Sequence, residues 1–321
     1  MDWSPNTTQQ TRKSRAQMLH DIRAFFLQRN ILEVETPALS QFGNTDPFIE
    51  SIQCIQHKSE SSELRYLHTS PEYPMKRLLA ADSGDIYQIS KVWRAGESGN
   101  KHNPEFTLLE WYRVGFSYQK LMQEVEELLS IVLPDLPKKP QFKTYESLFL
   151  EKFNINPHIA TNEQLIDCVR EHIDHLDTEG MNNQSLLDAI LSFCIEPEFE
   201  SSHLTFVYDY PVSQSALAQI RQTEHYPVAE RFEVYLGQSE LGNGYQEEVD
   251  SKRNKQILND ENQARKDFNL ETVKKDHLFL AAAEKGIPAS AGVAIGLDRV
   301  LMCITGEKSI QKVINFPWDK A

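Results

Sequence analysis

The sequence predicts an α+β protein in which a largely antiparallel sheet is flanked by helices. One observation is the order of the segments: period-two apolar patterns come early and late in the chain, with short helical patterns between them around residues 144–200. The other is a pair of strand patterns, at 85–93 and 105–113, joined by a polar loop. Such a pair predicts an antiparallel hairpin.

The first third of the chain begins with polar residues 1–12, which we expect to be frayed. Apolar residues then recur at helical spacing from residue 12 to 30. The following ILEVETP, residues 31–37, has strand character and is expected to stop at its proline, which cannot donate to a sheet. A helix is expected to begin after Pro71, because proline suits the first turn of a helix.

The rest of the chain repeats these patterns around a linker. Residues 133–140, LPDLPKKP, have the proline and lysine content of a connecting segment. We expect helices on both sides of it and a return to strands near residue 204. The remaining elements are a helix at 117–132, strands at 204–211 and 229–245, and helices at 247–269 and 272–285.

Composition narrows the class of function. The net charge of −14 and pI of about 5.2 disfavour a large nucleic-acid footprint and suit a cationic small substrate. No basic leader and no long apolar run occurs, so we expect a cytoplasmic protein that spans no membrane. Four cysteines without a CxxC pair fit a reducing compartment and indicate no zinc site.

The segment WRAGESGNKHNPEFTLLEWYR offers a nucleotide-binding constellation. Period two places Phe106, Leu108, Glu110 and Tyr112 on one face of a strand. Arg94 at the end of the preceding strand could bind a phosphate as a bidentate donor, and Phe106 could stack on a purine. Each residue alone would fit an ordinary hairpin, whereas the whole constellation favours a site.

The segment SELGNGYQEE contains Glu240 and Glu247, which an uninterrupted strand would direct to opposite faces. The Gly242–Asn243–Gly244 sequence permits a bend or bulge that would re-aim one of them. Two carboxylates near a phosphate suit Mg²⁺ or, equally, an ammonium group. The alternative is a pair of surface glutamates in an acidic chain.

Two further motifs carry candidate residues. In TSPEYPMKRLL, Glu72 is placed to interact with a helix dipole or to hold a substrate amine. SAGVAIGLDR has Gly292, Ala294 and Gly296 before Arg299, and lacks the GxGxxG spacing of a dinucleotide fingerprint.

Together these segments resemble class II aminoacyl-tRNA synthetase catalytic domains of the lysyl type, over about residues 13 to 318. ILEVETP is similar to motif 1 of that class, WRAGESGNKHNPEFTLLEWYR to motif 2, and GVAIGLDR to motif 3. The spacing from Arg94 to Glu97 is one residue longer than the arginine-x-glutamate of motif 2.

The resemblance implies a role for each matching residue. Arg94 and Arg299 would be catalytic, neutralising the phosphates of ATP. Glu240 and Glu247 would hold Mg²⁺ or the substrate amine. The implied ATP-binding residues are Arg94, Glu97, Asn103, Phe106, Glu240, Leu241, Gly296 and Arg299. The implied substrate-binding residues are Ser70, Pro71, Glu72, Tyr112, Glu247 and Ala294.

The resemblance also implies partners. Motif 1 implies a homodimer, and its position near the start of the chain leaves no room for an anticodon-binding domain, so we expect one catalytic domain over 13–321 and no tRNA binding. The chain is most similar to the free-standing lysyl-type ligases, which attach (R)-β-lysine to a lysine of elongation factor P through an aminoacyl-adenylate. Lysyl synthetases usually have glycine where this chain has Ala294, on the floor of the amino-acid pocket.

Other functions remain open from the sequence. The chain could activate α-lysine or another small amino acid for a different acceptor. It could be a non-catalytic paralogue that senses an amino acid, although Arg94 and Arg299 are both present. It could also be a structural dimer that keeps these motifs without activity.

Overall fold

A computed structural model describes residues 3–58, 61–134, 136 and 138–321. The chain divides into two compact units. The first comprises Met1–Phe116, Ile131–Leu133 and Glu248–Ala321, and the second comprises Ser117–Ser130 and Pro134–Glu247. Both units combine helices with mostly antiparallel strands, which confirms the predicted α+β class.

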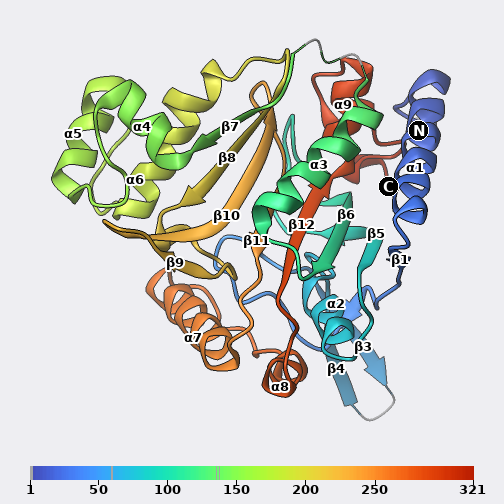
Figure 1. Ribbon diagram of the computed structural model, residues 1–321. Helices are drawn as coiled ribbons and strands as arrows, with labels where there is room; N and C mark the ends of the chain where they lie inside the picture. The colour runs from blue at the N-terminus through green and yellow to red at the C-terminus, as the bar shows by residue number, and fades with distance from the viewer. Residues whose placement is uncertain (1–2, 59–60, 135, 137) are drawn as a thin grey trace. The chain divides into compact units, whose positions relative to one another are not determined.

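Four strands of the first unit lie in the order β1, β5, β6, β12. Their bounds are β1 (Leu32–Glu33), β5 (Ile86–Trp93), β6 (Glu105–Val114) and β12 (Ser290–Gly296). The short β1 runs parallel to β5, whereas β6 is antiparallel to both of its neighbours, β5 and β12. The predicted hairpin at residues 85–113 is therefore confirmed, and Figure 1 shows β6 between β5 and β12.

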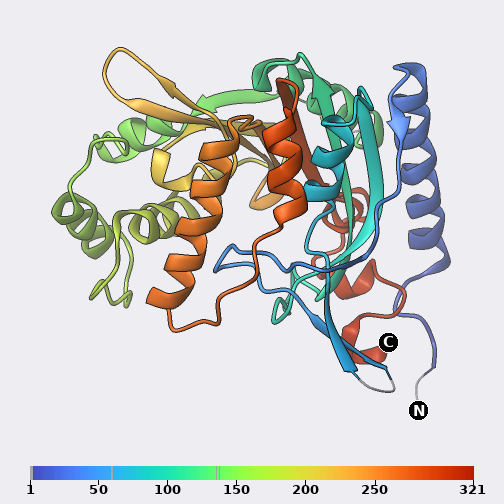
Figure 2. The same cartoon turned by 90° about the horizontal axis from the view of Figure 1, so that it is seen from below.

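Helices cover the two faces of these strands. On one face, α1 (Gln9–Gln28) runs alongside β5, as Figure 2 shows, and Phe26 stacks on Tyr87 at 4.2 Å. On the other face, α2 (Glu72–Leu79), α7 (Ser251–Asp267) and α8 (His277–Lys285) share a core with Ile86 and Tyr112. The strands therefore separate an α1 side from an α2 side.

The remaining elements of this unit flank that arrangement. A second, three-stranded antiparallel sheet has the order β2, β4, β3. Helix α9 follows β12 directly, ends before Gly306 in the left-handed conformation, and packs on α1. The bounds are β2 (Leu39–Ser40), β3 (Gln53–Lys58), β4 (Ser61–Leu67) and α9 (Leu297–Thr305).

The N-terminal segment differs from the expectation of fraying up to residue 12. Helix α1 begins at Gln9, because the Thr8 hydroxyl accepts the Thr11 amide and caps the first turn. The Asn6 amide also donates to the Asn315 carbonyl. The expectation of fraying was therefore wrong for residues 9–12, because it rested on their polarity and did not consider Thr8 as a helix cap.

The second unit contains four strands in the order β11, β10, β8, β7, with β9 paired to β10. Strand β7 is parallel to β8 and the other pairs are antiparallel. The bounds are β7 (Gln141–Thr144), β8 (Leu204–Tyr210), β9 (Ile220–Gln222), β10 (Pro227–Leu236) and β11 (Ser239–Gln246).

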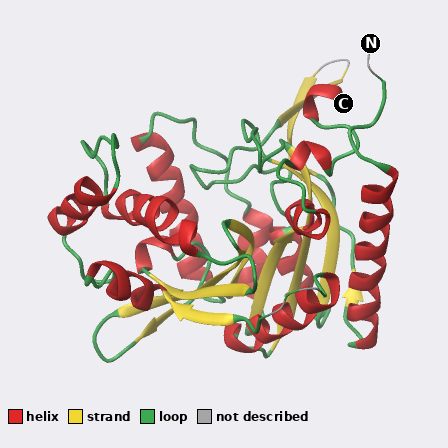
Figure 3. Ribbon diagram, turned by 90° about the horizontal axis from the view of Figure 1, so that it is seen from above, coloured by secondary structure: helices red, strands yellow, loops and turns green. Residues whose placement is uncertain are grey.

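The expected helical segment around 144–200 occurs in this unit. Its helices, red in Figure 3, pack through a shared core onto β8 and β10. Tyr145 and Phe149 of α4 contribute to that core, as do Val207 and Tyr235 of the strands. The bounds are α3 (Tyr118–Val132, most of which lies in this unit), α4 (Tyr145–Phe153), α5 (Asn162–His172) and α6 (Asn183–Ile190).

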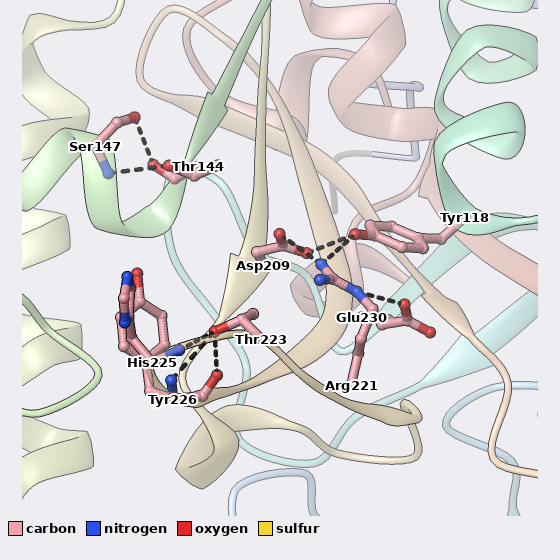
Figure 4. A network of polar contacts seen from close by, with 9 residues as sticks. All are labelled: Tyr118, Thr144, Ser147, Asp209, Arg221, Thr223, His225, Tyr226 and Glu230. Atoms are coloured by element: carbon pink, nitrogen blue, oxygen red, sulfur yellow. Dashed lines mark hydrogen bonds and ion pairs between the residues drawn. The ribbon is translucent and has the colours of Figure 1, made fainter.

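A polar network ties α3 to three strands of the same unit (Figure 4). Arg221 on β9 donates to Asp209 on β8 and to Glu230 on β10, both at 2.9 Å. Tyr118, at the start of α3, also donates to Asp209. Asp209 has a φ of +58°, which these bonds stabilise against the usual cost of that conformation.

Candidate active site

The α2 side of β6 carries the predicted constellation. Phe106, Leu108, Glu110 and Tyr112 alternate along the strand and share this face. Tyr112 belongs to the core beneath α2, and its hydroxyl donates to Glu110 Oε1 at 2.6 Å. The alternation predicted from the sequence is therefore confirmed by this contact between residues two apart.

Strand β12 presents two glycines and an alanine on the same face. Gly292, Ala294 and Gly296 lie directly opposite Tyr112, Glu110 and Leu108, respectively. Side chains of directly opposite residues lie on one face of a sheet. Two of the three have no side chain beyond hydrogen, so β12 adds little bulk to this face.

Glu110 is the centre of a hydrogen-bond network that joins distant segments. Only 3% of its surface is exposed. Its Oε2 accepts from the Ser70 hydroxyl at 2.7 Å and its Oε1 from Tyr112. Ser70 Oγ in turn accepts from the Glu72 amide at 3.0 Å. Two predicted substrate residues, Ser70 and Tyr112, are thus brought onto one buried carboxylate.

Glu72 begins α2 directly after Pro71, as the sequence predicted. Its carboxylate accepts from Lys76 Nζ at 2.6 Å, one turn later, and the Lys76 side chain is fully buried. Removing Glu72 would take an ion-pair partner away from a buried ammonium and should lower stability. Glu72 therefore has a structural partner in addition to its predicted role.

A cavity of about 270 Å³ lies beside Ser70 and Glu72. Its polar lining includes His68, whose Nε2 lies 2.7 Å from the Lys91 carbonyl. Burial lowers the pKa of His68, so the ring is neutral at pH 7. The cavity is further lined by Pro37, Leu39, Ser40, Gln41, Phe42, Gly43, Asn44, Ser51, Arg65, Thr69, Tyr73, Pro74, Arg77, Asp276 and Leu278.

Arg94 follows β5, and its guanidinium lies 5.1 Å from the centre of the Phe106 ring. Glu97 is its acidic neighbour, with a separation of 3.8 Å between Arg94 Nη1 and Glu97 Oε1. Arg94 Nε is buried and has no hydrogen-bond partner within the described part of the chain. The predicted phosphate and purine ligands are therefore adjacent.

Asn103 lies in the loop between β5 and β6 and is 6% exposed. Its side-chain amide donates to the Glu105 carbonyl at 2.6 Å, and its side-chain oxygen accepts from the Trp318 amide at 3.1 Å. These bonds fix the loop relative to the C-terminal segment. The predicted contact of Asn103 with adenine has no counterpart among these bonds and stays a prediction.

Arg299 lies in the first turn of α9, two residues after the helix begins at Leu297. Its Nη2 lies 2.8 Å from His102 Nε2. Because guanidinium only donates, that ring nitrogen is the acceptor and His102 is neutral. Burial and then the charge of Arg299 lower the pKa of His102 accordingly.

Asp298 positions Arg299, and the sequence reasoning did not single it out. It is 1% exposed and accepts from the Thr107 amide of β6 at 2.6 Å and from Arg15 of α1. These bonds fix the start of α9 against β6. An aspartate in a first helical turn is a common feature, so its partners could not be identified from sequence.

Glu240 and Glu247 belong to β11 and its end, in the second unit. The register with β10 shifts between Val234 and Tyr235, so that Leu241 is an extra residue on β11. With one extra residue, the seven positions between the glutamates count as six, which favours a shared face. The expected bulge is present, although the extra residue precedes the Gly-Asn-Gly sequence. The roles of Glu240 and Glu247 stay predictions.

No group of three or more histidine, cysteine, aspartate or glutamate side chains is arranged to hold a metal within residues 3–58, 61–134, 136 and 138–321. Among the same described residues, no helix is both long and apolar enough to cross a membrane. A Mg²⁺ ion bound through one or two carboxylates and substrate phosphates needs no such group.

Comparison with known proteins places this geometry in a family. The family described as tRNA synthetases class II (D, K and N) matches residues 1–320. The chain is 42% identical to the elongation factor P--(R)-beta-lysine ligase of Histophilus somni (strain 2336), over 99% of this chain and 98% of that protein. It is 40% identical to the ligase of the same name from Pseudoalteromonas translucida (strain TAC 125), also over 99% and 98%. The chain therefore belongs to the class II tRNA synthetase family of the D, K and N type and, within it, to the group of elongation factor P--(R)-beta-lysine ligases.

Proposed function

We propose that this protein uses ATP to activate (R)-β-lysine and joins it to the ε-amine of a lysine on elongation factor P. The observation that carries the proposal is the shared face of β6, where Arg94 and Phe106 lie at one end and the Ser70–Glu110–Tyr112 network at the other. A cationic phosphate ligand and a buried carboxylate for an amine suit the two substrates of such a reaction.

In the first step, a carboxylate oxygen of β-lysine attacks the α-phosphorus of ATP. The bond from that phosphorus to the bridging oxygen breaks, and pyrophosphate leaves. We assign Arg94 to the α-phosphate, Arg299 to the γ-phosphate, and Phe106 with Asn103 and Glu97 to the adenine. The contribution of Arg94 and Arg299 is positioning and neutralisation of charge that grows on the phosphates.

In the second step, the acceptor amine attacks the carbonyl carbon of the adenylate. The carbon–oxygen bond to AMP breaks, AMP leaves, and the nitrogen loses a proton. No covalent bond to the enzyme is needed. We assign Ser70, Glu72, Tyr112 and Ala294, with the turn at Pro71, to the amino-acid substrate.

Mg²⁺ bound with ATP would neutralise the phosphates. We assign Glu240 and Glu247 to Mg²⁺ or to the substrate amine, because two carboxylates suit either cation and the bulge at Leu241 between them favours one shared face. Leu241 and Gly296 are assigned to the nucleotide through their backbones. We propose that residues 13–321 form one catalytic domain and that residues 144–200 are a helical insertion in it. We propose that this domain does not bind tRNA.

Mass spectrometry of purified elongation factor P tests the proposal. After incubation with this protein, ATP and (R)-β-lysine, we expect the mass of one β-lysyl group on a single lysine. The same incubation with α-lysine is the control, and a stronger gain with α-lysine would reassign the substrate. No gain with any lysine isomer would overturn the proposal.

We also propose a homodimer, from the similarity of ILEVETP to the segment that forms the subunit interface in this class. Closed twofold dimers are the commonest soluble assemblies. Sedimentation at micromolar concentration should show twice the 37.0 kDa mass of the chain. A monomer under those conditions would count against the dimer.

A further inference from the structure

Gln88 is a buried residue of the site face to which neither the motifs nor the proposed mechanism gives a role. It lies in the middle of β5 and pairs directly with Glu110 of β6. Glu110 pairs on its other side with Ala294 of β12. Gln88, Glu110 and Ala294 therefore form one row across three strands, with their side chains on the same face.

The side-chain oxygen of Gln88 lacks a donor. The residue is 3% exposed, and its Oε1 is buried without a hydrogen-bond partner in the described structure. Buried polar atoms in native proteins are nearly always bonded, so such an exception calls for an explanation. Within this row, the missing donor is explained if it comes from a bound molecule.

The surroundings indicate what that molecule donates. The two oxygens of the neighbouring Glu110 accept from Ser70 and Tyr112, which fixes the carboxylate beside Gln88. An ammonium group has three donors and no acceptor, and so complements a carboxylate next to an amide oxygen. The neutral Gln88 amide supplies an acceptor oxygen without adding charge. A carboxylate in its place would be a second negative charge beside Glu110 and would favour protonation of one of the two carboxyl groups.

We propose that Gln88 is a specificity-determining residue that accepts a hydrogen bond from an amino group of the amino-acid substrate. The inference rests on the proposed function, because it deepens the assignment of the amino-acid site. It adds a ligand from β5, a strand within which the sequence motifs assign no site residue.

The test is binding of (R)-β-lysine to wild-type protein and to Gln88→Met, measured by calorimetry with a non-hydrolysable ATP analogue present. Methionine keeps the length of the side chain and removes the acceptor. We expect Gln88→Met to weaken amino-acid binding about tenfold or more, with nucleotide binding within about twofold. Gln88→Glu keeps an oxygen acceptor and should bind the amino acid more tightly than Gln88→Met, but less tightly than wild type because of the second carboxyl group beside Glu110.

Ser90→Ala is the matched control. Ser90 lies on the same face of the same strand, its Oγ is also buried without a partner, and it pairs with Leu108 instead of Glu110. We expect this variant to bind the amino acid as tightly as wild type. An equal loss in Ser90→Ala and Gln88→Met would show a general effect on β5 and overturn the inference.

Substrate analogues identify the amino group concerned. The penalty of Gln88→Met should vanish either for 6-aminohexanoate or for 3-aminohexanoate, whichever lacks the group that Gln88 holds. A penalty that persists with both, or equal binding of β-lysine by the variant and wild type, overturns the role of Gln88 alone. Failure of wild-type protein to bind any of these amino acids would overturn the proposed function as well.

Discussion

The two ends of the site face of β6 are organised differently. At the Glu110 end, the groups are already joined by short hydrogen bonds, at 2.7 Å from Ser70 and 2.6 Å from Tyr112. At the Phe106 end, Arg94 lies 3.8 Å from its acidic neighbour and leaves Nε without a partner in the described chain. The amino-acid end is preorganised, whereas the nucleotide end is completed by its ligand.

This difference has a physical reason. A buried carboxylate must be bonded in the free protein, since an isolated one is costly. A partly exposed guanidinium can be solvated until a phosphate replaces the water. We therefore expect substitutions at the nucleotide end to act on the reaction, and those at the amino-acid end to act on substrate binding and stability.

The largest effect is expected from Arg94→Ala and Arg299→Ala. Each should lower ATP–pyrophosphate exchange by roughly 1000-fold, because a charge that stabilises the transition state is removed. The unfolding temperature of Arg94→Ala should change little, since Arg94 and its acidic neighbour Glu97 are both partly exposed, at 27% and 28%. Arg23→Ala is the control, because Arg23 pairs with Glu33 at the surface. Near-normal exchange in both site variants would contradict the assignment.

Glu110→Gln should act on the amino acid in preference to the nucleotide. The amide has no charge and keeps only one of the two oxygens that accept from Ser70 and Tyr112. The change should raise KM for (R)-β-lysine by about 100-fold, or about 3 kcal/mol. The KM for ATP should stay within about threefold. Steady-state exchange kinetics with each substrate varied in turn measure both, and equal increases would break the comparison between the two ends.

Glu261 of α7, which accepts a hydrogen bond from Thr45, provides a pH test of stability. Burial raises the pKa of Glu261 to about 7, the hydrogen bond from Thr45 lowers it, and the charges of Asp46 and Glu72 add to the rise. A carboxyl with a raised folded-state pKa binds its proton more tightly when folded, so its contribution to stability is lost as pH rises from about 4.5 to about 7.

Glu261→Gln should remove that dependence. Above pH 7 the variant should be more stable than wild type by up to about 3 kcal/mol, and near pH 5 the two should be alike. Urea unfolding at a series of pH values measures the difference. Parallel stability curves for the two proteins would show that Glu261 ionises normally.

Ala294→Gly should have the smallest effect and the most specific one. Ala294 lies opposite Glu110 on β12, so its methyl group borders the amino-acid end. Removing it should shift selectivity towards α-lysine by about 1–3 kcal/mol in relative kcat/KM. Exchange assays with the two isomers check this, and unchanged selectivity would remove Ala294 from the specificity argument.

Local pattern was enough to predict several of these features. Period two put Phe106, Glu110 and Tyr112 on one face, and Pro71 marked the start of α2. The same period of two places Gly292, Ala294 and Gly296 on one face of β12. These predictions succeeded because they depend only on neighbouring residues.

Partners distant in the chain were decided by the tertiary structure. Ser70 bonds to Glu110 across 40 positions, and Asp298 bonds to the Thr107 amide across 191. The extra residue at Leu241 is defined by the register of β11 with β10. The side-chain oxygen of Gln88 has no donor among the described residues because the residue is buried in the sheet. Sequence alone determined which side chains share a face. Only the packing of separate elements determined which polar atoms are satisfied, because burial removes the water that would otherwise bond them all.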